Sequence, residues 1–249
     1  MIVEYHRPHT LEEALALLSR PAPLTLPLAG GTALAHRGPG TVAVVDLQAL
    51  GLDKLIRKGS SLQVGAMVTL QSLLESDQTG DLTPIILHEA TYNLRQVATC
   101  AGTLLAAGGR SPFTTALLAL DVSLVLQPGN ESIGLGDLLP FRHEQLRGRL
   151  VSQINLPLNP RLAYEYVART PADQPIVCAA LAEWPSGRTR LALGGFGDAP
   201  TLAFDGTEPG GIEAAARSAY SHSGDEWGSA EYRQEMAGVL ARRCLATLS

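Results

Sequence analysis

The sequence predicts an α+β protein of two domains, and three observations support this fold class. Its 249 residues suffice for one large domain or two modest ones. Apolar residues make up 45% of the chain, which is enough to build a core. Helix-like and strand-like apolar patterns alternate up to the two prolines within residues 157–160, and three strand-like runs and two helices follow.

The N-terminal elements are predicted from caps and apolar patterns. Thr10 to Glu13 have the spacing of a capping box, in which the Thr10 hydroxyl and the Glu13 carboxylate each satisfy a backbone amide at a helix start. Runs of apolar residues bounded by turn residues predict strands. These signals together predict strands at residues 24–28, 42–45 and 62–64, and helices at 11–18, 70–74 and 84–92.

The tract from Arg95 to Gly109 has no further charge and is rich in Ala, Gly, Thr and Leu. Its small residues argue against an ordinary helix and its glycines against a regular strand, so we expect neither. Arg95 and Arg110 flank this tract and could contact a phosphate, but we expect them to form salt bridges at the surface or with a partner. Residues 111–120 then predict a helix with Pro112 in its first turn, followed by a strand at 122–126.

The region after residue 160 predicts a small antiparallel sheet with helices. In the last helix, apolar residues including Met236, Leu240 and Cys244 recur at steps of three and four, which gives one buried face. The expected elements are strands at 163–167, 176–183 and 189–193 and helices at 212–219 and 229–248. We therefore expect domains at residues 1–157 and 161–249.

Composition and charge exclude several function classes. The net charge is −5, and the chain has no cluster of Lys and Arg interleaved with aromatic residues, so we expect no nucleic-acid partner. The apolar stretch of residues 97–120 is interrupted by Arg110 and several Gly and Pro residues, so it is a poor membrane span. Only 17% of residues are charged, which fits either a surface buried against other subunits or a well-packed monomer.

The cysteines and the N-terminus indicate a cytoplasmic protein. Cys100, Cys178 and Cys244 lie far apart without a CxxC pair, which argues against a disulfide framework and against metal or cluster ligation by this chain. Buried thiols in a reducing compartment are expected instead. A charge at Glu4 interrupts the N-terminus, which lacks the order of a signal peptide.

Signatures of self-sufficient catalysis are missing from the sequence. There is no GxSxG elbow and no GxxxxGK[ST] loop. His88-Glu89 and His143-Glu144 begin like a zinc helix, but Tyr92 and Arg147 stand where the second histidine is needed. We therefore expect both to be surface pairs, and we predict no catalytic residue and no metal ligand.

Two glycine-bearing turns are the strongest candidates for a binding site. Gly30-Gly31-Thr32 follows a predicted strand, and Ala101-Gly102-Thr103 lies in the uncharged tract. Small residues let backbone amides converge on one space, which suits a phosphate or a diphosphate, and threonine hydroxyls add donors. A tight structural turn remains the simpler interpretation of either turn taken alone.

These turns belong to an ordered series of motifs that resembles a known family. Leu28-Ala29-Gly30-Gly31-Thr32 resembles the first flavin-binding loop of the FAD-binding medium subunits of molybdopterin dehydrogenases, of the carbon monoxide dehydrogenase and xanthine dehydrogenase type. Arg95-Gln96-Val97-Ala98-Thr99-Cys100-Ala101-Gly102 resembles the second loop. Further short matches, including Val64-Gly65-Ala66-Met67-Val68-Thr69, extend the series over nearly the whole chain.

The resemblance implies a two-lobed FAD-binding domain of the PCMH type, followed by a C-terminal domain of the carbon monoxide dehydrogenase flavoprotein type. It implies FAD as cofactor, and partner subunits that carry molybdopterin (large) and two [2Fe–2S] clusters (small). This chain would then be an oxidoreductase subunit that passes electrons from those clusters through FAD to an acceptor and is not catalytic alone. The implied cofactor-binding residues, through their backbone amides, are Ala29, Gly30, Gly31, Thr32, Ala33, Thr99, Cys100, Ala101, Gly102 and Thr103.

Three departures from the family pattern keep an alternative open. Ala101 replaces a glycine, Pro112 stands where an Asp is usual, and Gln174 stands where an aromatic residue often faces the flavin. Each departure removes a contact that contributes about 1 kcal/mol. The alternative is a degenerate member that has lost FAD and serves as a non-catalytic scaffold subunit.

Overall fold

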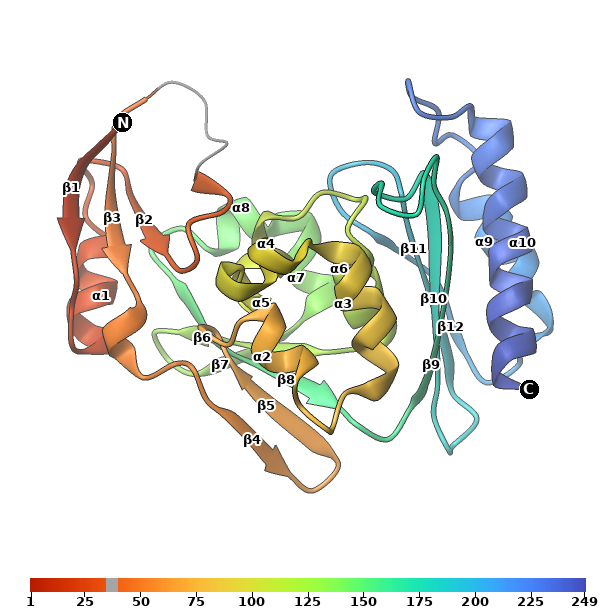
Figure 1. The fold of residues 1–249 in the computed structure, drawn as a ribbon, viewed down its shortest axis with the longest axis horizontal. Helices are drawn as coiled ribbons and strands as arrows, with labels where there is room; N and C mark the ends of the chain where they lie inside the picture. Colours follow the sequence, from red (N-terminus) through yellow and green to blue (C-terminus); the bar gives the residue numbers. More distant parts are fainter. Residues whose placement is uncertain (35–39) are drawn as a thin grey trace. The chain divides into compact units, whose positions relative to one another are not determined.

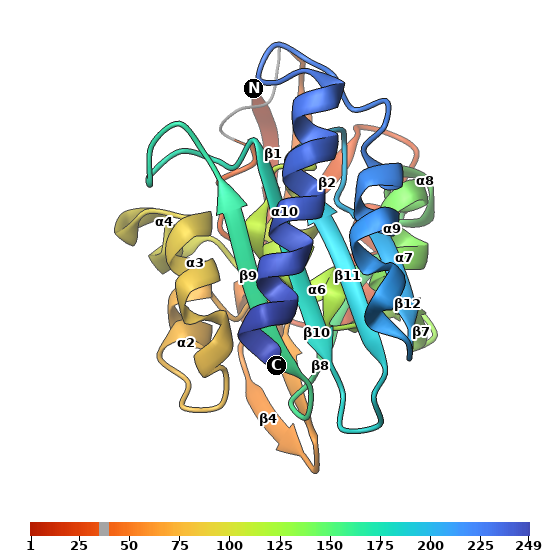
Figure 2. The same ribbon diagram turned by 90° about the vertical axis from the view of Figure 1, so that its right-hand side faces the viewer.

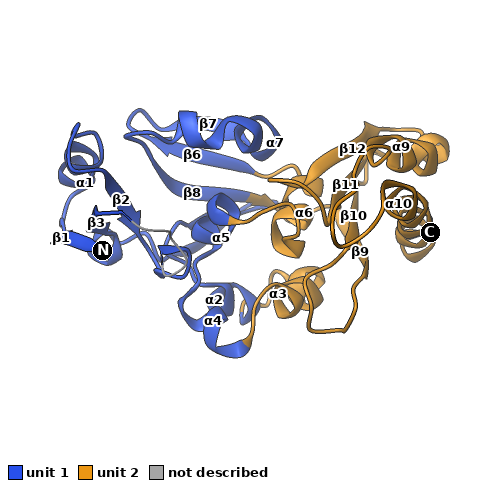
Figure 3. Cartoon of the chain, turned by 90° about the horizontal axis from the view of Figure 1, so that it is seen from above, with its two compact units in different colours: residues 1–75, 92–106, 123–155 blue, residues 76–91, 107–122, 156–249 orange. Residues whose placement is uncertain are grey.

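The chain folds into two compact units, each assembled from three chain segments (Figure 3). The computed structural model describes residues 1–34 and 40–249. Unit 1 comprises residues 1–75, 92–106 and 123–155, and unit 2 comprises residues 76–91, 107–122 and 156–249. Unit 2 therefore includes two segments that precede residue 157. Both units combine helices and sheets, as the predicted α+β class requires.

Unit 1 contains a three-stranded parallel sheet near the N-terminus (Figure 1). Its strands are β1 (Ile2–His6), β2 (Thr25–Leu28) and β3 (Val42–Asp46), in the order β1-β3-β2. Helix α1 (Leu11–Leu18) packs its buried Ala14 and Leu18 with Val45 and Leu47. All five residues of the central strand β3 are buried, as its apolar run predicts.

A second, five-stranded sheet completes unit 1 and supplies the second of the two expected lobes. Its strand order is β4-β5-β8-β6-β7, and its inward-facing side chains, such as Leu62 and Leu124, are fully buried. The strands are β4 (Leu55–Lys58), β5 (Ser61–Gly65), β6 (Ser123–Gln127), β7 (Glu131–Gly134) and β8 (Leu150–Pro157). The helices of this part are α2 (Leu70–Leu74), α4 (Tyr92–Val97), α5 (Cys100–Ala106), α7 (Leu135–Leu138) and α8 (Arg142–Gln145).

Unit 2 is built on a four-stranded antiparallel sheet covered on both faces (Figure 2). Helices α9 (Ile212–Ala219) and α10 (Ala230–Leu248) lie on one face, and α6 (Pro112–Ala119) lies on the other. The strands are β9 (Arg161–Val167), β10 (Val177–Glu183), β11 (Thr189–Gly194) and β12 (Thr201–Gly206), in the order β12-β11-β10-β9. The segment of unit 2 before α6 adds α3 (Thr83–Glu89).

The predicted helix caps are confirmed. The Thr10 hydroxyl accepts a hydrogen bond from the Glu13 amide at 3.2 Å. The Glu13 carboxylate accepts one from His9, one residue before the cap. The Thr69 hydroxyl accepts one from the Ser72 amide at 3.0 Å and starts α2. Each cap supplies a partner for an amide that the first helical turn leaves open.

The prediction for residues 95–109 is wrong, because this tract is largely helical. Residues Tyr92–Val97 form α4 and residues Cys100–Ala106 form α5. The Thr99 hydroxyl accepts from the Gly102 amide at 3.1 Å, so it caps α5, and the Ala and Leu residues are good helix formers. Arg95 is also not a surface residue: it is 8% exposed, and its Nε donates to the side chain of Gln71 at 3.2 Å.

The expectation of a surface pair at His88-Glu89 is wrong as well. In unit 2 the His88 ring donates to the Asp173 carbonyl at 2.8 Å and lies 3.1 Å from the Tyr164 hydroxyl. The Glu89 carboxylate accepts from the Ser111 hydroxyl at 2.8 Å and from the Phe113 amide at 2.9 Å, at the start of α6. Burial nevertheless raises the pKa of Glu89 above its usual range, and these two hydrogen bonds oppose the rise only in part.

We predict that Glu89→Gln stabilises the protein at neutral pH. The folded-state pKa of Glu89 is raised, so the ionised carboxylate weakens folding at any pH above that pKa. The gain of the variant over the wild type should shrink as the pH falls toward the ordinary glutamate pKa of about 4.3, where the wild-type group is protonated. Urea unfolding midpoints measured at several pH values check this. Equal midpoints at neutral pH would contradict it.

Arg233 joins α10 to two loops of unit 2. Its side chain is 0% exposed and donates to the carbonyls of Ile176 and Ser223 and to the carboxylate of Asp225. A buried guanidinium is tolerated only when its donors are paired. The three acceptors satisfy this condition and hold both loops against the N-terminal half of the helix.

We predict that Arg233→Met lowers the free energy of unfolding by about 3 kcal/mol, because it leaves the buried carbonyl groups of Ile176 and Ser223 without this donor. It also removes the ion pair with Asp225, whose carboxylate keeps the donated bonds from the Trp227 and Gly228 amides. Arg242 provides a matched control on the same helix, since its side chain is 62% exposed and pairs with Glu213 at 3.6 Å. Arg242→Met should cost no more than about 1 kcal/mol. Urea denaturation compares the two variants, and equal losses would disprove the assigned role.

Candidate functional site

The two glycine-bearing segments line one pocket in unit 1, with a volume of about 430 Å³. Eight of the ten predicted site residues lie in its wall: Ala29, Gly30, Gly31, Thr32, Ala33, Thr99, Ala101 and Gly102. The remaining wall is mainly apolar and includes Leu26 of β2, Leu105 of α5, and Leu150 and Val151 of β8. The fold thus brings together two turns that are about seventy residues apart in sequence.

Cys100 and Thr103 are not part of this wall. Cys100 is fully buried, and its thiol points to the Thr69 carbonyl at 3.7 Å. Burial raises the pKa of the Cys100 thiol far above its usual range, so the group is an inert thiol. Residues 99–103 turn through a helix start, so successive side chains point in different directions. Cys178 and Cys244 are likewise free and buried, as predicted.

The first turn owes its shape to its two glycines. Gly30 passes so close to the end of α4 that an added Cβ would lie 1.8 Å from the Val97 carbonyl oxygen. Gly31 has a φ of +73°, a backbone conformation that side chains disfavour. Only a glycine pair therefore lets the chain leave β2 and run directly against the segment that precedes α5.

The first turn also has free hydrogen-bond donors. Among the residues that the structure describes, the backbone amides of Gly30, Gly31, Thr32 and Ala33 donate to no protein acceptor. These residues lie in the pocket wall, and the first three are half-buried. Half-buried amides without protein partners are available to a ligand with several acceptor oxygens.

The second turn supplies fewer donors than the sequence analysis expects. The amide of Cys100 donates to the Val68 carbonyl at 2.8 Å, and that of Thr103 donates to the Thr99 carbonyl at 2.8 Å. Gly102 is also engaged, through the Thr99 hydroxyl. The amides of Thr99 and Ala101 have no acceptor within residues 1–34 and 40–249. The second turn therefore contributes mainly the small residues Thr99, Ala101 and Gly102 to the pocket wall and few hydrogen-bond donors.

The departure at Ala101 does not strain the backbone. In the described chain, the non-glycine residues with positive φ are Asp121 and Asn130, so Ala101 has an ordinary helical conformation. Its methyl group is 4% exposed and occupies space at the base of the pocket wall. Alanine is therefore compatible with this turn.

The other two departures lie in unit 2. Pro112 is the first residue of α6, where Ser111 caps the helix by accepting from the Thr114 amide at 3.1 Å. The backbone carbonyl of Gln174 accepts from Arg110 at 2.6 Å, and that of Pro175 accepts from the same guanidinium at 2.9 Å. Arg110 thus binds two carbonyl groups, and the surface salt bridge expected within the chain does not form among residues 1–34 and 40–249.

The chemistry of the pocket suits the diphosphate of a dinucleotide. A diphosphate brings several acceptor oxygens, which match the free amides of the first turn, while apolar side chains line the rest of the cavity. The family model for the FAD-binding domain in molybdopterin dehydrogenase matches residues 1–159. The chain belongs to this family. The resemblance found in the sequence is therefore confirmed, and the pocket lies within the matched region.

Relatives match this chain over almost their full length. It is 29% identical over 251 residues to the uncharacterized protein YgfM of Escherichia coli K12, covering 96% of this chain and 94% of YgfM. It is 27% identical over 273 residues to the carbon monoxide dehydrogenase medium chain of Afipia carboxidovorans, covering 97% and 95%. The similarity thus extends through both units.

A solved structure confirms the fold. Reconstituted carbon monoxide dehydrogenase from Oligotropha carboxidovorans contains a chain that matches with a TM-score of 0.84 at 24% identity, covering 98% of this chain and 96% of that one. Within the described residues, no helix is long and apolar enough to cross a membrane. The same residues contain no group of three or more metal-binding side chains.

We predict that Gly30→Ala destabilises the protein by about 3 kcal/mol, because its Cβ would displace the Val97 carbonyl. FAD affinity should fall with it, since the displaced turn carries the free amides. Gly80→Ala is the matched control, because a Cβ there meets no described atom within 4 Å. Thermal unfolding and FAD titration of both variants check this. A Gly30→Ala protein as stable as the control would contradict the close approach.

Proposed function

We propose that this chain is the FAD-binding electron-transfer subunit of a molybdenum hydroxylase complex. The observation that supports this most directly is the cradle of free amides at Gly30 to Ala33, which faces the Thr99 to Gly102 turn across one apolar pocket. The first turn would hold the diphosphate of FAD, the Ala101 amide would add a donor, and Leu105, Leu150 and Val151 would exclude water. FAD, when bound, supplies the redox chemistry that carries electrons from iron–sulfur clusters to an acceptor.

The partners follow from the same proposal. A large subunit with molybdopterin would oxidise the substrate, and a small subunit would carry two [2Fe–2S] clusters. Support comes from the medium-chain relative, whose name places it in a complex with other chains. Three free buried cysteines support a cytoplasmic location.

We predict that the purified chain is yellow and releases FAD on denaturation. If it is isolated without cofactor, it should take up added FAD, with a flavin absorption spectrum and quenched flavin fluorescence. A chain that stays colourless and takes up no FAD would disprove the proposal. If such a chain still copurified with a molybdopterin subunit and an iron–sulfur subunit, it would be a scaffold that has lost its cofactor.

A further inference from the structure

The carboxyl edge of the parallel sheet in unit 1 contains a buried carboxylate. Asp46 ends the central strand β3 and is 2% exposed. One carboxylate oxygen accepts from the Gln48 amide at 2.9 Å. The other accepts from the Tyr5 hydroxyl of β1 and lies 3.8 Å from Nε of Arg7. A buried carboxylate needs such donors, so this group fixes the end of β1 to the end of β3.

The same strand end is joined to the first glycine turn. Asp46 pairs in register with Leu28, the last residue of β2, and the Leu47 amide donates to the Leu28 carbonyl at 3.1 Å. Ala29 then packs against the cluster that contains Val45 and Leu47. The residues on both sides of Asp46 therefore contact the start of the turn, and Leu47 also lines the pocket.

The Tyr5 hydroxyl can serve as a permanent donor in this arrangement. Its hydrogen bond to the Asp46 carboxylate is the main cause that raises the pKa of Tyr5 above its usual range, with the nearby negative charge as a further cause. The hydroxyl therefore keeps its proton through the physiological range. Its ring is largely exposed at the sheet edge, at 56%, so the hydroxyl can be removed with little loss of packing.

We propose that Tyr5 and Asp46 are positioning residues for the diphosphate cradle, setting the backbone of residues 29–33 through Leu28 and Leu47. This inference rests on the proposed FAD function. Neither side chain lines the pocket, so neither touches the cofactor. The hydrogen bond between Tyr5 and Asp46 fixes the end of β3 relative to β1. The pairing of Asp46 with Leu28, and the bond from the Leu47 amide to the Leu28 carbonyl, then fix the start of the turn that presents the amides of Gly30 and Gly31.

The test measures the dissociation constants of FAD and of ADP, which shares only the diphosphate and adenosine part. Tyr5→Phe should raise both constants by the same factor, about tenfold. Asp46→Ala is the second variant, and the double variant should bind no worse than Asp46→Ala alone, because each change removes the same hydrogen bond between Tyr5 and Asp46. Binding is measured at a temperature where each protein is fully folded by circular dichroism.

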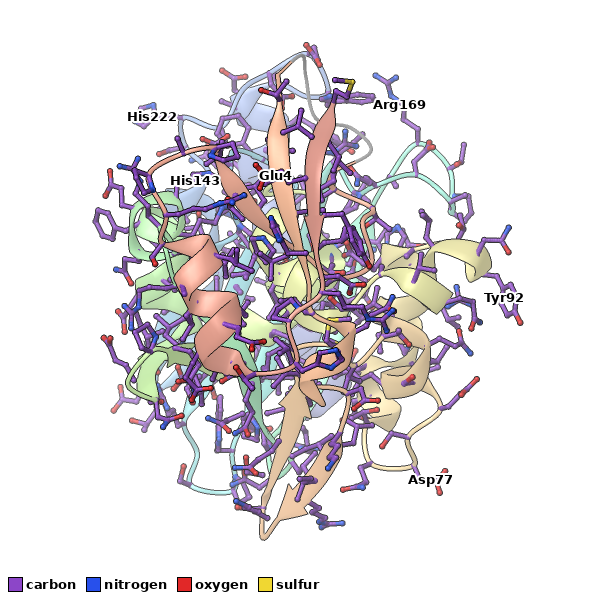
Figure 4. All side chains as sticks on the ribbon, turned by 90° about the vertical axis from the view of Figure 1, so that its left-hand side faces the viewer. Glu4, Asp77, Tyr92, His143, Arg169 and His222 are labelled. Carbon is purple, nitrogen blue, oxygen red and sulfur yellow. The ribbon has the colours of Figure 1, made fainter. Side chains whose placement is uncertain are left out.

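Tyr92→Phe is the matched control. Tyr92 projects outward from α4 at 65% exposure (Figure 4), and its hydroxyl has no hydrogen bond within the described chain. It should leave both constants unchanged. If Tyr5→Phe lowered the unfolding midpoint but kept both constants, or weakened FAD without weakening ADP, the positioning role would be overturned. If the wild type bound neither ligand, the proposed function itself would fail.

Discussion

The backbone of Gly30 runs so close to the carbonyl group of Val97 that no side chain fits between them. This contact joins a turn that follows a strand of the parallel sheet to the last residue of α4. It keeps the pocket narrow and places the free amides of the first turn opposite Thr99 and Ala101. The proposed cofactor site depends on this one approach, because a wider crossing would separate the donors from the opposite wall.

Local signals predicted much of the fold. The caps at Thr10 and Thr69, the apolar run at 42–45 and the stepwise apolar face of the last helix are set by neighbouring residues, so they could be found without a structure. The helices within 92–106 could not. The Cys100 amide bonds to the Val68 carbonyl, and this distant contact adds to the local cap at the start of α5. His88 and Glu89 resemble surface residues in sequence, yet their partners lie at residues 111–113, 164 and 173.

The sequence likewise predicted part of the pocket wall and missed the rest. Both turns could be found from their glycines and neighbouring small residues, because glycine adopts backbone conformations that other residues disfavour. The sequence could not show that Thr103 lies outside the pocket wall, since this depends on the direction of α5. It also could not place Leu150 and Val151 in the wall, because β8 reaches the pocket only through the strand order of the five-stranded sheet.

The position of helix α6 in the sequence limits which fragments of this protein can fold and when unit 2 can fold during synthesis. All eight of its residues are buried, and it covers one face of the sheet whose strands begin at Arg161. A fragment beginning at residue 161 would therefore expose an apolar sheet face to water and invite aggregation. During synthesis, α6 leaves the ribosome before the strands that it covers. Unit 2 can therefore complete its core only when translation is nearly finished.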